Sequence, residues 1–226
     1  MPVMHKEEQG MSRRNFLLLS AGAICTSILC HEIVGAASEE PGSEFIESTC
    51  QKDGTMKKRV LISYASRCGS TGGVAEAMGQ VLCGMGASAD IRLVRNVDDL
   101  SAYHAVIVGS AIRMSKWLPE AAVFVKNNQD ILGRLPTAYF MVCLTMKDDT
   151  AENRSKVMAY LDPVRKEAPK IQPVAVGLFP GALNFGKLSA VDKMILKAKG
   201  ASEGDYRDWP AVKAWASAVG PMLPLT

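Results

Sequence analysis

The stretch from Val60 to Val74 constrains the fold of this chain more than any other. An apolar run of strand length, Arg59 to Tyr64, passes abruptly into small, hydroxyl-bearing and glycine residues. An apolar period of about 3.6 residues then runs from Val74 to Met85, which indicates a helix. The loop of such a strand–loop–helix unit directs backbone N–H groups and the positive end of the helix dipole at one small volume. The sequence therefore predicts a phosphate site here, with an ordinary strand-to-helix turn as the alternative.

The residues of this loop indicate which class of phosphate ligand it would bind. It lacks the G-x-x-x-x-G-K-[ST] of nucleoside triphosphate sites and the G-x-G-x-x-G of dinucleotide sites, so a terminal monophosphate suits it better. Its residues resemble the flavodoxin FMN-phosphate loop, [ST]-x-T-G-x-[ST], with cysteine in place of the middle threonine. The resemblance implies FMN as the cofactor, bound by Ser66, Arg67, Cys68, Gly69, Ser70 and Thr71. Cys68 is then either a small donor beside the phosphate or an acidified, reactive thiol.

The first quarter of the chain looks like a targeting segment. Residues 1–56 carry 4 Lys+Arg against 8 Asp+Glu, whereas residues 57–226 carry 22 against 15. Residues 12–17, S-R-R-N-F-L, resemble the twin-arginine export motif, and the apolar run that follows is shorter than the roughly 20 residues of a membrane span. We expect 1–37 to be a signal or an uncleaved anchor, and 38–56 to be a linker without a core-forming pattern. The protein would then lie in the periplasm or on the outer face of the membrane, and otherwise at the cytoplasmic face.

The cysteines do not suggest a metal or dithiol site. Cys83 and Cys143 fall in apolar helix and strand patterns, which predicts buried, inert thiols, and Cys50 falls in the linker. The sequence contains no C-x-x-C and no histidine cluster. We therefore expect no metal site.

Strands and helices alternate through residues 57–226, the predicted folded domain. After the first helix, strands are expected at 89–94, 104–110, 137–144 and 173–179, and helices around 118–125, 157–164 and 212–219, the last capped by Asp208. This alternation predicts an α/β fold, a flavodoxin-like, doubly wound, five-stranded parallel sheet of order 2-1-3-4-5.

In that fold the ligand lies at the carboxyl ends of the first and third strands. The loops expected to enclose a flavin ring are therefore 110–117 and 145–149. Trp117 is predicted either to stack on the ring or to cap the core, and Arg113 or Lys116 to stabilise a reduced flavin. Asp148 and Asp149 fit a solvated helix start better than catalytic acids. From these two loops we expect the cofactor contacts to be Ser110, Ala111, Ile112, Arg113, Trp117, Thr145 and Met146.

A further segment follows the fifth strand. Residues 181–185, G-A-L-N-F, lead to a capping box, Ser189 to Asp192, and to a short amphipathic helix closed by Gly200. Together with 109–113 and 205–212, this segment resembles the flavodoxin-type, menaquinone-dependent protoporphyrinogen oxidases over roughly residues 58–222. The helix at 187–199 either lies on a membrane or covers a sheet edge.

The resemblance implies an FMN-dependent oxidoreductase that takes two electrons from a protoporphyrinogen-like small molecule and passes them to a membrane quinone. The chemistry would reside on FMN, with no catalytic side chain and no nucleic-acid partner. Export conflicts with a haem-synthesis role, because that substrate is made and used inside the cell. The alternatives are a flavodoxin-type electron carrier outside the cytoplasm and a flavin-free module that binds another anion.

Overall fold

The computed structural model describes residues 45–51, 58–198 and 200–223. The predicted signal, residues 1–37, and all of the predicted linker except residues 45–51 lie outside the described residues. Within the described part, no helix is long and apolar enough to cross a membrane.

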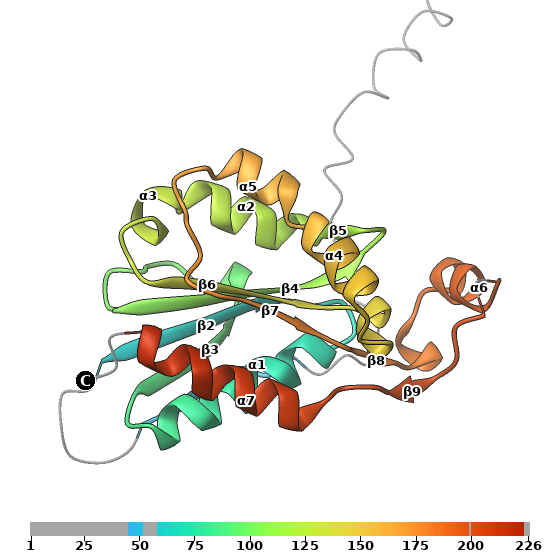
Figure 1. Cartoon of the computed structure of the whole chain (residues 1–226), viewed down its shortest axis with the longest axis horizontal. Helices are drawn as coiled ribbons and strands as arrows, with labels where there is room; N and C mark the ends of the chain where they lie inside the picture. The colour runs from blue at the N-terminus through green and yellow to red at the C-terminus, as the bar shows by residue number, and fades with distance from the viewer. Residues whose placement is uncertain (1–44, 52–57, 199, 224–226) are drawn as a thin grey trace, which may run out of the picture. The chain divides into compact units, whose positions relative to one another are not determined.

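A central sheet organises the described residues (Figure 1). Five parallel strands follow the order β3-β2-β4-β6-β7, which is the predicted order 2-1-3-4-5. They are β2 (Arg59–Ala65), β3 (Ser88–Leu93), β4 (Ala105–Arg113), β6 (Thr137–Val142) and β7 (Val176–Phe179). The predicted flavodoxin-like fold is confirmed.

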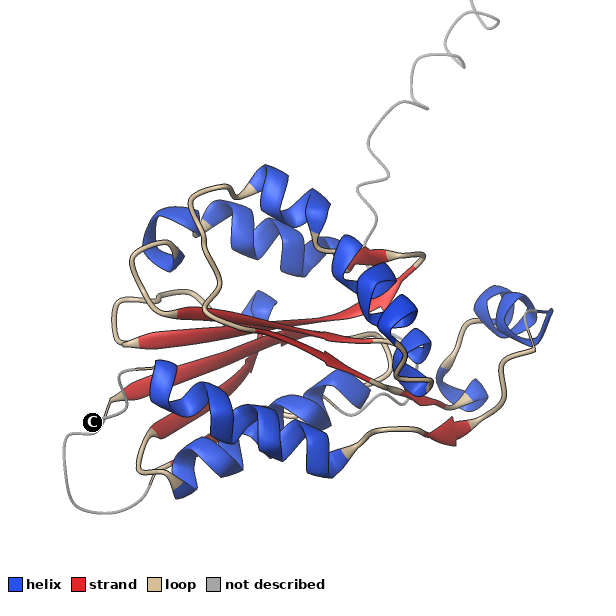
Figure 2. Cartoon of the chain, viewed as in Figure 1, coloured by secondary structure: helices blue, strands red, loops and turns tan. Residues whose placement is uncertain are grey.

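The sheet is covered by helices on both faces, so its central strands are mostly apolar, with Ser63, Ser110 and Thr137 as buried polar residues. In β2, Val60, Ile62 and Tyr64 pack into the core on one face, and Leu61 and Ala65 into the core on the other. Figure 2 shows the two helical layers on either side of the sheet. One layer contains α1 (Ser70–Gly84) and α7 (Trp209–Val219); the other contains α2 (Pro119–Asn127), α3 (Gln129–Leu132), α4 (Ala151–Ala159) and α5 (Asp162–Glu167).

Most helix ends follow the sequence signals. Asp208 caps α7, with its carboxylate accepting from the Ala211 amide at 2.9 Å. The helix predicted around 157–164 is instead two helices, α4 and α5. Pro163 lies in the first turn of α5, where its missing N–H costs no hydrogen bond, and so it starts a new helix rather than continuing α4.

The linker prediction is wrong for residues 48–50. Residues 48–50 form β1 (Ser48–Cys50), which pairs antiparallel with β3 at the sheet edge. Cys50 is joined by a disulfide to Cys83, so the predicted inert thiol of Cys83 is also wrong. Neither feature has a periodic apolar signature, because an edge strand is held by backbone pairing and a disulfide by proximity in space.

The segment after β7 forms a separate projection. β8 (Ala182–Leu183) and β9 (Gly204–Asp205) pair as a two-stranded sheet. α6 (Ala190–Ala198) follows β8 and precedes β9 in the sequence, and it lies away from both helical layers (Figure 1). Ser189 caps α6 as predicted: its hydroxyl accepts from the Asp192 amide at 3.2 Å and donates to the Asp192 carboxylate at 2.9 Å. Gly200 has a left-handed φ of 73° and closes the helix.

Candidate functional site

The turn between β2 and α1 has the backbone of an anion site. Gly69 precedes α1 with φ 84° and ψ −17°, a left-handed conformation that suits glycine. The Gly69 amide donates to the Ser66 hydroxyl at 3.0 Å, which holds the turn open toward the helix. No acidic residue lies in the first turn of α1 and no side chain among the described residues caps it. The positive end of the helix dipole is therefore available to a bound anion.

Thr71 supplies the strongest sign of a ligand. Its side chain is completely buried, and its hydroxyl oxygen has no hydrogen-bond partner among the described residues. A buried hydroxyl without a partner costs about 1–3 kcal/mol, so such groups are rare unless something else binds them. Because Thr71 lies in the first turn of α1, an anion at the helix N-terminus is a suitable partner.

Arg67 and Cys68 contact other parts of the protein. The Arg67 guanidinium forms a two-pronged ion pair with the Glu120 carboxylate at the start of α2, with Nη2 3.0 Å from Oε2. The Cys68 thiol donates to the Lys187 carbonyl at 3.3 Å. Arg67 thus connects the turn to the entry of α2, and Cys68 connects it to the segment after β8.

The residues after β4 form a hairpin rather than an open loop. β4 continues to Arg113, and β5 (Lys116–Trp117) pairs back onto it through Met114 and Ser115, whose φ angles are 51° and 62°. The buried Ser110 hydroxyl donates to the Ala111 carbonyl at 2.7 Å and accepts from the Leu118 amide at 2.9 Å.

The Ser110 hydroxyl thus holds the hairpin in place, and contact of Ser110 with the cofactor stays a prediction. Ala111 and Ile112 are half-buried against the core on the α2 side of the sheet.

Trp117 lies in the core on the α2 side of the sheet. It is 5% exposed and packs edge-on against Tyr139, with ring centroids 5.3 Å apart. This burial supports the alternative that Trp117 caps the core.

Arg113 reaches across to the projection. Its Nη2 lies 2.7 Å from both carboxylate oxygens of Asp192 on α6. This ion pair joins the hairpin after β4 to a helix 79 residues further along the chain. Sequence reasoning placed Arg113 beside the ring and did not foresee that it also anchors α6.

The last predicted loop is a 3₁₀ turn, Leu144–Lys147, directly after β6. Met146 is buried in the core, whereas Thr145 is half-buried, and contact of either residue with the cofactor stays a prediction. Asp149 forms an exposed ion pair with Arg154, as a solvated helix start would. The Lys147 ammonium lies 4.5 Å from the centre of the Tyr206 ring. Tyr206 thus brings to this loop the aromatic side chain that the loop itself lacks.

A cleft of about 1040 Å³ opens beside the turn. Cys68, Gly69 and Ser70 line it together with the segment 45–48 and the β8–β9 sheet. No residue of the hairpin after β4 or of the 3₁₀ turn is among its lining residues. Of the six predicted phosphate residues, Cys68, Gly69 and Ser70 therefore line this cleft, whereas Ser66, Arg67, Thr71 and the other predicted contacts are not among its lining residues.

Arg207 is a residue of this cleft that sequence reasoning missed. Its guanidinium stacks on Trp209 at 4.5 Å and pairs with Asp205. A Cβ atom built on Gly73 would lie 2.6 Å from its Nη1, so the positive charge rests on the start of α1. Arg207 belongs to residues 205–212, D-Y-R-D-W-P-A-V, whose resemblance to the family was noted from the sequence. Only the three-dimensional packing shows that its guanidinium lies beside the start of α1. The described residues contain no group of three His, Cys, Asp or Glu placed to hold a metal ion.

Comparisons with known proteins give one family match and several similar proteins. A family model described as a flavodoxin domain matches residues 61–208. Among solved structures, oxidised Flavodoxin 2 from Bacillus cereus is 18% identical, with 72% of this chain and 98% of that chain covered and a TM-score of 0.46. Oxidised Flavodoxin 1 from the same organism is 15% identical, with 63% and 95% covered and a TM-score of 0.41.

Two similar curated proteins carry the name protoporphyrinogen IX dehydrogenase [quinone]. The one from Escherichia coli K12 is 24% identical over 172 residues, which are 70% of this chain and 92% of the relative. The one from Leishmania major is 28% identical over 127 residues, 52% of this chain, and the match spans only about half, 54%, of that relative.

Proposed function

The chain belongs to the flavodoxin-domain family, and on that premise we propose that this FMN oxidoreductase takes two electrons from a protoporphyrinogen-like small molecule and passes them to a membrane quinone. The names of the relatives from Escherichia coli and Leishmania major support the substrate class and the quinone. FMN, when bound, supplies the redox chemistry. The residues of this chain bind and orient it.

The phosphate end of the site fits FMN. The buried Thr71 hydroxyl lacks a partner, Gly69 holds the turn in a left-handed conformation, and the helix N-terminus carries no acidic side chain. A monophosphate supplies what each of these features lacks, namely acceptor oxygens and negative charge. Ser66, Gly69, Ser70 and Thr71 would hold the phosphate, with Arg207 as a nearby positive charge.

The observation that carries the quinone part of the proposal is the unpartnered face of α6. None of the residues of α6 whose burial is described is buried. Val191 and Met194 lie on one face of this helix and are 62% and 67% exposed, and Ile195 lies beside them. Lys193 and Lys197 lie off that face and suit anionic lipid headgroups.

The ion pair between Arg113 and Asp192 links this face to the cofactor loops. It holds α6 beside the hairpin after β4, whose tip residue Met114 is 86% exposed. We propose that α6 and Met114 together rest on the membrane surface. A quinone that leaves the bilayer at this place would meet the protein beside the hairpin predicted to enclose the flavin ring.

Vesicle binding tests the membrane step. Met194→Glu should reduce co-sedimentation of the full chain with vesicles that contain anionic lipid, because it places a charge on the apolar face. Val123→Glu is the matched control: Val123 is 52% exposed on α2, which belongs to one of the two helical layers and not to the projection that contains α6. Equal binding by both variants and the unaltered chain would remove α6 from the proposal.

The disulfide between Cys50 and Cys83 favours a second candidate function. Disulfides persist in oxidising compartments, which agrees with the proposed export through a twin-arginine signal. Protoporphyrinogen is made inside the cell, so an exported protein would serve another donor or act as an electron carrier.

An anaerobic titration separates the two functions. We would record the visible absorbance of the full chain, identify any flavin released on denaturation, and titrate the bound flavin with a quinol and a quinone. FMN that exchanges electron pairs with the quinone supports the dehydrogenase. FMN that reacts only with one-electron donors supports the carrier, and a protein that takes up no FMN contradicts both.

A further inference from the structure

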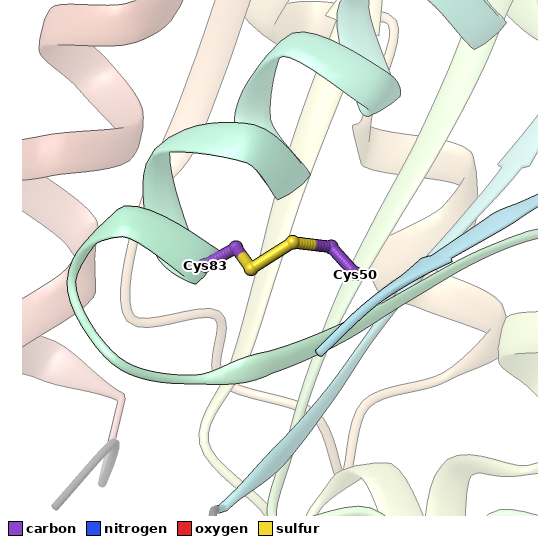
Figure 3. The surroundings of a disulfide bond; sticks show 2 residues. All are labelled: Cys50 and Cys83. Atoms are coloured by element: carbon purple, nitrogen blue, oxygen red, sulfur yellow. A yellow bond between two sulfur atoms is a disulfide. The ribbon is translucent and has the colours of Figure 1, made fainter. Parts of the chain in front are cut away.

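The disulfide joins the segment before β2 to the helix that begins at the predicted phosphate turn. Cys50 ends β1 and Cys83 lies in the last turn of α1, the helix whose first turn carries the predicted phosphate residues (Figure 3). The two Cα atoms are 6.2 Å apart, across 33 residues of sequence. We call residues 45–50 the N-terminal strap.

The strap forms one wall of the cleft that contains the phosphate turn. Residues 45–48 line this cleft together with Cys68, Gly69 and Ser70. Polar contacts tie the strap to the sheet edge. The Glu47 carboxylate accepts from the Leu93 amide at 2.9 Å, and the Arg92 guanidinium donates to the Ser48 carbonyl at 3.0 Å and to the Thr49 hydroxyl at 2.9 Å.

Tyr64 connects the strap to the phosphate turn. Its hydroxyl donates to the Ile46 carbonyl at 2.8 Å, while its ring is completely buried beneath α1. A Cβ atom on Gly72 would lie 2.7 Å from that hydroxyl, so the first turn of α1 rests on the polar end of Tyr64. Burial raises the pKa of Tyr64 to about 12. The phenol is therefore neutral at physiological pH and needs an acceptor, which the strap supplies.

From this geometry we propose that the Cys50–Cys83 disulfide keeps the strap on Tyr64 and thereby fixes the turn that binds the FMN phosphate. Formation of the disulfide removes two electrons and two protons from the thiols, and a thiol–disulfide oxidase outside the cytoplasm accepts them. Reduction by a dithiol reverses the step and leaves only non-covalent contacts to hold the strap. Tyr64 acts here as a positioning residue. The inference rests on the proposed function, because it concerns the affinity for FMN.

This arrangement suits a protein exported in its folded state. FMN enters in the reducing cytoplasm, where the thiols are free to remain reduced and the strap is held less tightly. After export the disulfide forms, and the bound cofactor is held more firmly in a compartment where a lost FMN is not replaced. Tighter binding of FMN once the disulfide has formed thus suits an exported protein.

The test is the dissociation constant of FMN, measured with the full chain by quenching of flavin fluorescence. We expect reduction with dithiothreitol to weaken binding about tenfold, which corresponds to the loss of roughly one hydrogen bond's contribution. The Cys50→Ser/Cys83→Ser double variant should bind weakly with or without dithiothreitol, which controls for other effects of the reductant.

Tyr64→Phe tests the route of the coupling. Without the hydroxyl, the difference between oxidised and reduced protein should shrink to less than about twofold, since the strap no longer has a group to hold. If the double variant does not fold, reduction of the unaltered chain still gives the result. Equal FMN affinity in the oxidised and reduced forms would overturn the inference and leave the proposed function standing. A chain that binds no FMN in either form would instead refute the proposed function.

Discussion

The Thr71 hydroxyl gives the sharpest prediction, because one substitution should move two quantities in opposite directions. Thr71→Val keeps the shape of the side chain and removes the hydroxyl. In the FMN-free protein that hydroxyl is buried without a partner among the described residues. Its removal should stabilise the free protein by about 1–2 kcal/mol. For a domain of this size, each kcal/mol raises the melting temperature by roughly 2–4 °C.

FMN binding should change the other way. A hydrogen bond from the hydroxyl to a charged phosphate oxygen contributes about 1.5–3 kcal/mol, so Thr71→Val should weaken FMN binding by roughly 10- to 150-fold. Thr71→Glu should go further and empty the site by repelling the phosphate. Calorimetric melting of the FMN-free protein and titration with FMN measure the two effects separately.

Ser63→Ala is the matched control. The Ser63 hydroxyl is also buried without a partner among the described residues, but it lies inside β2 and away from the turn. Its removal should stabilise the free protein and leave FMN affinity unchanged. Two results would refute the reasoning: FMN affinity unaltered in Thr71→Val, or a free protein destabilised by that change.

Three further predictions concern other parts of the chain. Burial by itself would raise the pKa of Asp90, but hydrogen bonds from Thr49, Arg59 and Tyr103 and the charge of Arg59 outweigh it and hold that pKa below its usual value. The stability that Asp90 contributes is therefore complete above about pH 4, the pKa of an unfolded aspartate, and is lost as the pH falls through the lower folded value. Urea unfolding from pH 7 to pH 2 should show this loss, and Asp90→Asn should remove that part of it. Gly109→Ala places a Cβ atom 2.0 Å from the Phe140 ring and should destabilise the domain by about 3 kcal/mol in denaturant unfolding, whereas Gly84→Ala, where a Cβ meets nothing within 4 Å, should not. A reporter fused to residues 1–40 should cross the membrane only when Arg13 and Arg14 are both present, and export of an Arg13→Lys/Arg14→Lys variant would contradict the twin-arginine prediction.

Local sequence determined the fold class and the phosphate end of the site. The apolar runs of β2, β4 and β6 mark strands buried on both faces, and the alternation of strands and helices leaves few topologies. Gly69 and Thr71 can be picked out from the sequence because a phosphate-binding turn between a strand and a helix has its glycine and its hydroxyl at neighbouring positions. The capping residues Asp208 and Ser189 are likewise local, since a cap bonds within three residues.

Side-chain direction in the two loops was not available from the sequence. Trp117 lies just before α2, and nothing in the neighbouring sequence tells whether the indole faces the ligand or the core. The hairpin of β4 and β5 decides this, because it turns Trp117 onto Tyr139. The same hairpin occupies the Ser110 hydroxyl. Arg113 meets Asp192 only because the chain returns past the hairpin after β7.

The sequence by itself thus determined what depends on neighbours along the chain: the strands, the helix caps and the turn proposed to bind an anion. Only the tertiary structure decided what depends on residues far apart meeting in space. Cys50 and Cys83, and Tyr64 and Ile46, are pairs of this kind, separated by 33 and 18 residues. A periodic pattern reports which face of an element is buried, but it does not report which distant residue will be packed against that face.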